Sequence, residues 1–213
     1  MTTTSNSTIH RVADPRPHLD RAIATGAAVV AGVRTDQLTD PTPCTEMDVR
    51  AVLCHLVGVL DRITALGNGE DPFAVLESPA PDDGWSEAWA AAAARAVDAW
   101  SDDAVLERPM ALPWIQGSGA DVLTIFLSEL TVHTWDLATG IGQQPDWDDV
   151  VVTAALDAPQ VLPAENRRAL FAQISAAMGF DEVAIPFAEA VPVPADAPAI
   201  DRLVAWNGRD PGR

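Results

Sequence analysis

The chain of 213 residues contains no lysine and no tyrosine, and all thirteen of its cationic side chains are arginines. The lack of lysine excludes catalysis through a lysine Schiff base and a phosphate-binding loop that depends on a lysine. The lack of tyrosine excludes a phenolic general acid. Both absences are typical of GC-rich coding and say less about the chemistry of the protein.

Cysteines and long apolar runs are also scarce. Cys44 and Cys54 are too few for a disulfide framework in a chain of this size. Cys54 adjoins His55 and is a possible extra ligand, but we expect it to pack in the core. Cys44 either lines a pocket or fills space, and we favour packing. The polar N-terminal residues lack the apolar segment of a signal peptide. No apolar run approaches the roughly 18 residues that a membrane-spanning helix needs. These features predict a cytoplasmic protein that is not inserted in a membrane.

Acidic residues dominate the charge, with 31 Asp and Glu against 13 basic residues and a net charge of −18. Such a surface repels phosphate backbones and anionic lipids, so we expect neither nucleic-acid binding nor docking to a membrane. The hydrophobic fraction of 48% is enough for a packed core. We predict a flexible N-terminal arm over residues 1–17 and a single domain over residues 18–213, with a C-terminal extension from about residue 141. The sequence leaves a homodimer open.

Helical spacing of apolar and small residues covers most of the chain, and no strand pattern extends beyond short fragments. The pattern predicts an all-α fold, a four-helix bundle with additional C-terminal helices. The bundle helices are expected at residues 18–38, 46–66, 86–101 and 121–139, and the additional ones at 148–162, 165–178 and 199–206. Thr45 and Ser86 are the expected N-caps of the second and third helices, and residues 107–120 are expected to be extended.

Two histidines and one glutamate stand out in the predicted helices. His55 lies in the middle of an apolar helical run, where a buried imidazole needs partners for its ring nitrogens. Glu129 and His133 are four residues apart and therefore share one helix face. Taken singly, each fits a core histidine or a simple ion pair. Together, on inward faces of two bundle helices, they predict a divalent-metal site with open positions, as in catalytic zinc proteins.

Four further residues are candidates for the surroundings of this site. Asp136 follows His133 by three residues, and it either orients an imidazole or a substrate or is solvated near the helix end. Arg62 returns to the helix face of the first histidine two turns later. An acidic substrate would need Arg62 or Arg50 for local charge compensation. Trp114, in the extended segment, is a candidate for a pocket wall.

Two helix motifs and the C-terminal tail carry a family resemblance. The sequence reads TPC at 42–44, VR at 49–50, HLVG at 55–58, ELTVHTWDLA at 129–138, DRL at 201–203 and GRDP at 208–211. These segments resemble the branch of the DinB-like superfamily typified by mycothiol-dependent maleylpyruvate isomerase, and within it a group of compact actinobacterial metal-binding proteins. The likeness spans about residues 18–211.

The resemblance implies a four-helix bundle that holds zinc, or another divalent ion, through His55, Glu129 and His133. It also implies a small-molecule substrate and mycothiol as a thiol cosubstrate, used for S-transfer or for isomerisation through a thiol adduct. Met47 stands where the family often has tryptophan, which we interpret as a packing position. About 70 residues follow Gly140, fewer than the second domain of the larger isomerases needs, so maleylpyruvate isomerisation itself is not expected.

The same ligand set allows two other functions. Water in the open position would become a hydroxide nucleophile, as in metal-dependent hydrolases. A bundle can also bind metal without catalysis and serve as a sensor or interaction protein. Because the ligands supply no sulfur, Ni²⁺ or Fe²⁺ are alternatives to Zn²⁺. The acidic surface favours a neutral or cationic electrophile, or a sugar-like thiol, over a dicarboxylate.

Overall fold

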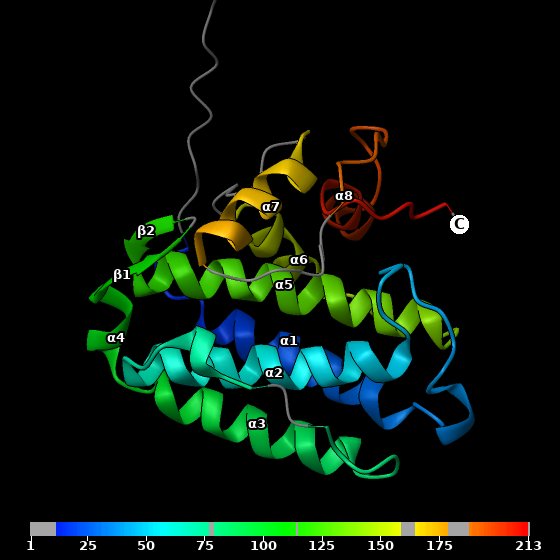
Figure 1. The fold of residues 1–213 in the computed structure, drawn as a ribbon, viewed down its shortest axis with the longest axis horizontal. Helices are drawn as coiled ribbons and strands as arrows, with labels where there is room; N and C mark the ends of the chain where they lie inside the picture. The colour runs from blue at the N-terminus through cyan, green and yellow to red at the C-terminus, as the bar shows by residue number, and fades with distance from the viewer. Residues whose placement is uncertain (1–11, 77–78, 114, 159–164, 179–187, 213) are drawn as a thin grey trace, which may run out of the picture.

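The computed structural model describes residues 12–76, 79–113, 115–158, 165–178 and 188–212, and it confirms the all-α fold (Figure 1). Four long helices form the bundle: α1 (Arg16–Ala31), α2 (Val49–Asn68), α3 (Trp85–Ala99) and α5 (Gly119–Gly140). Helices α1 and α2 each pack against both α3 and α5, so the first two helices of the chain occupy diagonal corners. This is the predicted DinB-like four-helix bundle, to which C-terminal helices are added.

The interior of the bundle is apolar and closely packed. Leu56 and Leu127, from the facing helices α2 and α5, are both fully buried. Gly26 of α1 lies against the ring of Trp89 on α3. A Cβ atom at this position would be 2.4 Å from the ring, so a side chain here would collide with it. Such close packing makes the core sensitive to the loss of even small volumes.

Helix α5 is the most enclosed element of the fold. Helices α1 and α2 pack on one side of it, and α6 (Asp149–Leu156) and α8 (Ala199–Trp206) pack on it from the C-terminal part of the chain. Every residue from 130 to 138 is buried as a result. A helix covered in this way is expected to be apolar all round, so the polar residues that it does carry need internal partners.

The extended segment between α3 and α5 forms a short helix and a hairpin. Helix α4 (Asp103–Glu107) is followed by the antiparallel strands β1 (Pro109–Leu112) and β2 (Ile115–Ser118). The Ser118 side chain accepts a hydrogen bond from the Asp121 backbone N–H, and the Asp121 carboxylate accepts one from the Ser118 N–H at 3.0 Å. This reciprocal cap starts α5 at Gly119, two residues before the predicted start.

The start of α2 differs from the prediction. Its N-cap is Asp48, whose side chain accepts a hydrogen bond of 2.8 Å from the Ala51 backbone N–H, so the predicted cap at Thr45 is wrong. A β-bridge between Pro41 and Asp48 closes the preceding loop, and the Val49 N–H donates to the Asp40 carbonyl. These contacts hold the residues before 49 outside the helix.

Other helix boundaries also move. Helix α1 begins at Arg16, inside the predicted N-terminal arm. It ends at Ala31, seven residues before the predicted end at residue 38. The chain then forms the 3₁₀ turn η1 (Thr35–Gln37), which directs Leu38 into the core. The N-cap of α3 is Gly84 and not Ser86. Helix α6 ends at Leu156, and residues 159–162 of the predicted helix lie outside the described residues. The remaining elements are η2 (Pro72–Ala74) and α7 (Arg167–Met178).

Candidate metal centre

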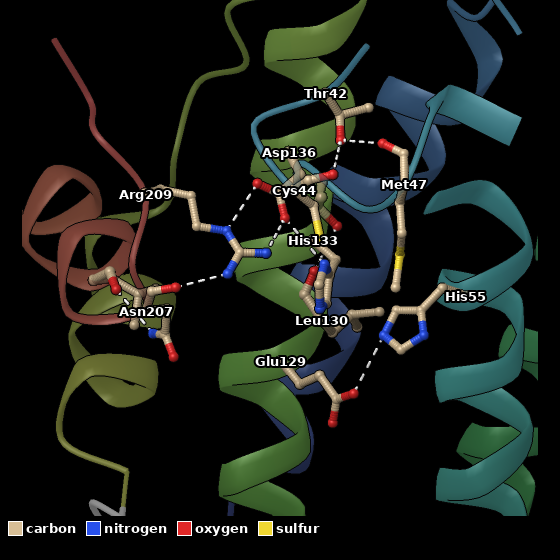
Figure 2. A network of polar contacts seen from close by, with 12 residues as sticks. Thr42, Cys44, Met47, His55, Glu129, Leu130, His133, Asp136, Asn207 and Arg209 are labelled. Atoms are coloured by element: carbon tan, nitrogen blue, oxygen red, sulfur yellow. Dashed lines mark hydrogen bonds and ion pairs between the residues drawn. The ribbon is translucent and has the colours of Figure 1, made fainter. Parts of the chain in front are cut away.

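Helices α2 and α5 bring the three predicted ligands together on their facing sides (Figure 2). His55, Glu129 and His133 each offer one donor atom, and these atoms all lie within 4.8 Å of one another. The His55 Nε2 atom is 3.3 Å from the Glu129 Oε1 atom. The two imidazole rings meet edge to face, with centroids 4.5 Å apart and an interplanar angle of 74°. The cluster is therefore compact and arises from two helices far apart in sequence.

Burial is uneven across the cluster. The His133 side chain is fully buried, the His55 side chain is 9% exposed, and the Glu129 side chain is 21% exposed. The edge formed by Glu129 and His55 is thus the one that solvent reaches. A molecule entering the cluster would meet these two side chains before it meets His133.

The inner imidazole is held from behind by a buried chain of polar contacts. The His133 Nδ1 atom is 3.0 Å from Oδ2 of Asp136, one helical turn further along α5. The Asp136 carboxylate in turn accepts two hydrogen bonds from Arg209, from Nε at 3.0 Å and from Nη2 at 2.6 Å. Asp136 is fully buried, so the alternative of a solvated aspartate near the helix end is wrong.

These surroundings set the protonation of the two donors on α5. Burial acts to raise the pKa of Glu129, but the neighbouring His55, followed by His133 and Arg62, holds that pKa below its ordinary value. Burial, together with the charge of His55, lowers the pKa of His133 to about 4. At neutral pH the site therefore presents an ionised carboxylate and a neutral imidazole, which are the forms that bind metal ions.

The donor set fits a divalent cation. Because Asp136 engages Nδ1 of His133, Nε2 is the ring nitrogen left to face a metal, and a carboxylate behind a ligating histidine is a common arrangement in zinc proteins. Two imidazoles and one carboxylate match the three-ligand set of catalytic zinc sites and also suit Ni²⁺ or Fe²⁺. These three residues would hold the ion, and its presence and identity stay predictions.

Cys44 lies beside the inner part of the site. Its sulfur, together with donor atoms of His133 and Asp136, forms a second group within 4.8 Å. Burial raises the pKa of the Cys44 thiol, so in the metal-free protein it stays protonated at neutral pH. Cys54 is half-buried against the core. Both placements agree with the packing role expected for the two cysteines.

The other candidate residues are placed differently. Arg62 is half-buried on α2, and its charge helps to lower the pKa of Glu129. Arg50 does not join the cluster, because its guanidinium forms an exposed ion pair with Asp82. Trp114 lies outside the described residues. Met47 is half-buried and its side chain points toward His55 in Figure 2, as a packing residue would.

Sequence reasoning overlooked Arg209 as part of the site. This residue is 3% exposed and lies 73 positions from the aspartate it contacts. The only trace of it in the sequence is the GRDP motif at 208–211, which contributed to the family resemblance without suggesting a role. A contact over such a separation has no periodic signature, so only the folded chain reveals it.

Comparisons with known proteins identify the family of this chain and two relatives. The family model of the mycothiol maleylpyruvate isomerase N-terminal domain matches residues 19–138, which contain all three candidate ligands. Two relatives from Mycobacterium tuberculosis, uncharacterized protein Rv0738 of strain H37Rv and uncharacterized protein MT0763 of strain CDC 1551, are each 30% identical over 196 residues. The alignments cover 92% of this chain and 98% of each relative. No solved structure matches the chain significantly.

Within the described part of the chain, no helix is both long and apolar enough to cross a membrane. The matched region begins in α1, contains α2 and α3, and ends two residues before the end of α5, so it covers the bundle and its candidate ligands. The chain belongs to the family of the mycothiol maleylpyruvate isomerase N-terminal domain.

Proposed function

We propose that this protein is a divalent-metal-dependent enzyme that activates a low-molecular-weight thiol of the mycothiol type for S-transfer or thiol-assisted isomerisation. The observation that carries the proposal is the convergence of His55, Glu129 and His133, whose donor atoms lie within 4.8 Å of one another at a solvent-reachable edge. A bound divalent ion would lower the pKa of an incoming thiol and so provide thiolate at neutral pH.

The charges of the surrounding residues suit an anionic sulfur. A divalent ion with one carboxylate and two neutral imidazoles leaves a formal charge of +1, which a single thiolate neutralises. Asp136 does not change this balance, because Arg209 compensates its charge. The charge of Arg62 also reaches the Glu129 side of the cluster. The chain's own residues therefore favour one anionic ligand at the centre.

The net charge of the protein and the exposed side of the site bear on the chemical class of the substrate. The net charge of −18 opposes the approach of a dianionic acid. Arg50, one of the two arginines expected to assist such a substrate, is already paired with Asp82. A neutral or cationic electrophile, brought to the thiol from the Glu129 side, is the substrate class that these features support.

Cobalt substitution tests the proposal directly. We expect purified, untagged protein to bind one Co²⁺ per chain, and mycothiol to add a thiolate-to-cobalt charge-transfer band. Glu129→Gln and His55→Ala should lose the ion, whereas His18→Gln, which changes a half-buried histidine of α1 outside the cluster, should retain it. The matched control separates loss of ligands from general damage.

Three results would contradict the proposal. Failure of wild-type protein to take up Zn²⁺, Ni²⁺, Co²⁺ or Fe²⁺ would remove the metal site. Metal binding with no response to mycothiol, but with turnover of an ester or amide, would indicate a hydrolase. Metal binding with neither response would indicate a non-catalytic bundle.

A further inference from the structure

We propose that the C-terminal segment completes the metal centre, with Arg209 as a positioning residue that acts on His133 through Asp136. The inference rests on the proposed role of His133 as a ligand and extends the site beyond residues 19–138, the region that the family model matches. The hydrogen bonds of Arg209 described above reach the centre through the Asp136 carboxylate, and its charge also acts on His133.

The contact between Arg209 and Asp136 has two hydrogen bonds and a fixed geometry. Arg209 approaches the carboxylate of Asp136 with two donors, Nε at 3.0 Å and Nη2 at 2.6 Å, which is the paired arrangement that a guanidinium favours. The side chains of Asp136, Arg209 and His133 are between 0% and 3% exposed. Water cannot readily replace any member of this chain, so each depends on the next.

The local backbone is built to present Arg209 at this place. Gly208 follows α8 with a φ of +84°, a conformation that other residues adopt with strain. A Cβ atom there would lie 2.7 Å from the backbone of Ala188, so glycine also permits close packing. The Arg209 N–H then donates to the Val204 carbonyl, and its Nη1 donates to the Asn207 carbonyl at 2.6 Å. Arg209 is thus held at its backbone by Val204 and at its guanidinium by Asn207, in addition to the contact with Asp136.

Fixing Asp136 fixes the tautomer of His133. With the carboxylate held as an acceptor, the proton of the neutral imidazole belongs on Nδ1, and Nε2 is free of its proton to act as a ligand. Without Arg209, the Asp136 charge would be buried with its main cationic partner removed, an arrangement that proteins avoid by moving or neutralising the group. The imidazole would then lose the acceptor that orients it.

The contact also links the metal centre to the attachment of α8. Because Arg209 follows α8 and Asp136 lies on α5, anything that detaches the C-terminal segment also loosens His133. Coupling of this kind is reciprocal, so metal binding should in turn strengthen the attachment of the segment.

The test measures metal affinity and histidine tautomer in full-length variants. For Arg209→Gln we expect a 10- to 100-fold loss of Co²⁺ affinity in a chelator competition, the range typical of residues behind metal ligands. Arg209→Lys should recover part of the loss, since an ammonium retains the charge but not the paired geometry. In an Asp136→Asn background, Arg209→Gln should have little further effect, because its route to His133 is already broken.

Arg167→Gln is the matched control. Arg167 is a second buried arginine of the C-terminal region, whose guanidinium carbon lies 5.1 Å from the Trp206 ring centroid and whose Nη1 donates to the Ala188 carbonyl at 2.8 Å. Its loss removes these contacts to Ala188 and Trp206 but leaves the Arg209–Asp136 pair in place, so Co²⁺ affinity should stay within about twofold of wild type. Equal losses of affinity in both variants would overturn the proposal in favour of a general structural role for Arg209.

Nitrogen-15 spectra of the histidine rings in metal-free protein supply an independent readout. We expect wild-type His133 to carry its proton on Nδ1 and Arg209→Gln to show a mixture of tautomers. An unchanged tautomer together with unchanged affinity overturns the inference while the proposed function stands. If wild type binds no metal, the proposed function fails, and the tautomer shift alone still decides whether Arg209 positions His133.

Discussion

The bundle and the C-terminal region bury different kinds of side chain. The largest fully buried residues of the bundle are all apolar: Trp89, Trp100, Leu19, Leu38, Leu53, Leu56, Leu60, Ile63, Leu123, Leu127 and Leu130. The C-terminal region attaches through small apolar patches on α6 and α8, but it also buries Arg167, Asn207 and Arg209. The bundle is held mainly by apolar packing, although it also buries polar residues such as His133 and Asp136, whereas the C-terminal region is attached by both packing and the contacts of its buried arginines.

The difference shows which contacts require one defined geometry. Apolar packing is non-directional and tolerates changes of detail, whereas a buried arginine must find its partner in one geometry. His133 lies on the boundary between the two regions, with His55 and Glu129 on the bundle side and Asp136 and Arg209 behind it. We therefore expect the bundle to determine global stability and the C-terminal region to tune the site.

The largest effect is expected from Trp100→Ala, which removes a packed bundle residue. Trp100 is 1% exposed, and its indole N–H donates to the Ile63 carbonyl at 2.7 Å. The free energy of unfolding should fall by about 3–5 kcal/mol, as for other buried tryptophans. Denaturant unfolding of metal-free protein measures this change. A loss below about 1 kcal/mol would show that the bundle core is not the main source of stability.

Acid should destabilise the metal-free protein through His133, at the boundary of the two regions. Its folded pKa of about 4 lies below the ordinary value of 6.5, so the unfolded chain binds more protons between these values. Stability should therefore fall as the pH drops from about 6.5 to about 4, by roughly 3 kcal/mol in total. Comparing unfolding of wild type and His133→Gln across this window isolates the contribution. Parallel curves for the two proteins would contradict the prediction.

A smaller effect on stability is expected from Gly208→Ala, which strains the backbone of the C-terminal region directly before Arg209. The variant combines a left-handed backbone with a Cβ atom 2.7 Å from Ala188, so we expect a loss of about 1–3 kcal/mol and faster hydrogen exchange in α8. Gly142→Ala is the matched control, because Gly142 has a similar φ of +72° but no atom within 4 Å of the added carbon. The control should lose about 1 kcal/mol or less. Equal losses would mean that the contact with Ala188 is unimportant.

The smallest effect is expected from Arg50→Gln, which breaks an exposed ion pair of the bundle. Its partner Asp82 is half-exposed, and solvent weakens such pairs. We expect unchanged Co²⁺ affinity and a slight loss of stability that disappears at high salt. A marked loss of Co²⁺ affinity would return Arg50 to the site, where the sequence analysis had placed it as a candidate.

The sequence predicts the bundle well because each helix carries its own periodic pattern. Helix α8 is found at the predicted residues, and His55, Glu129 and His133 meet because two strong helical patterns face each other. The errors fall where long-range contacts override local propensity. Thr45 is a good cap by residue type, but the bridge from Pro41 to Asp48 moves the helix start beyond it.

The same limit explains the site residues that sequence reasoning misplaced or missed. Asp136 is consistent with solvation as long as its partner is unknown, and Arg209 is identifiable only once α8 lies against the rest of the fold. Arg50 is a candidate from the sequence because it could compensate the charge of an acidic substrate, but its side chain pairs with Asp82 in the loop before α3. Side-chain contacts between residues far apart in the sequence leave no local sequence pattern from which they could be predicted.

The graded exposure of the three donors has a consequence for a bound cation. A cation arriving from solvent meets the half-buried Glu129 first and the fully buried His133 last. A divalent ion bound here would be reached from solvent at the carboxylate of Glu129 and held at the buried end by the imidazole of His133.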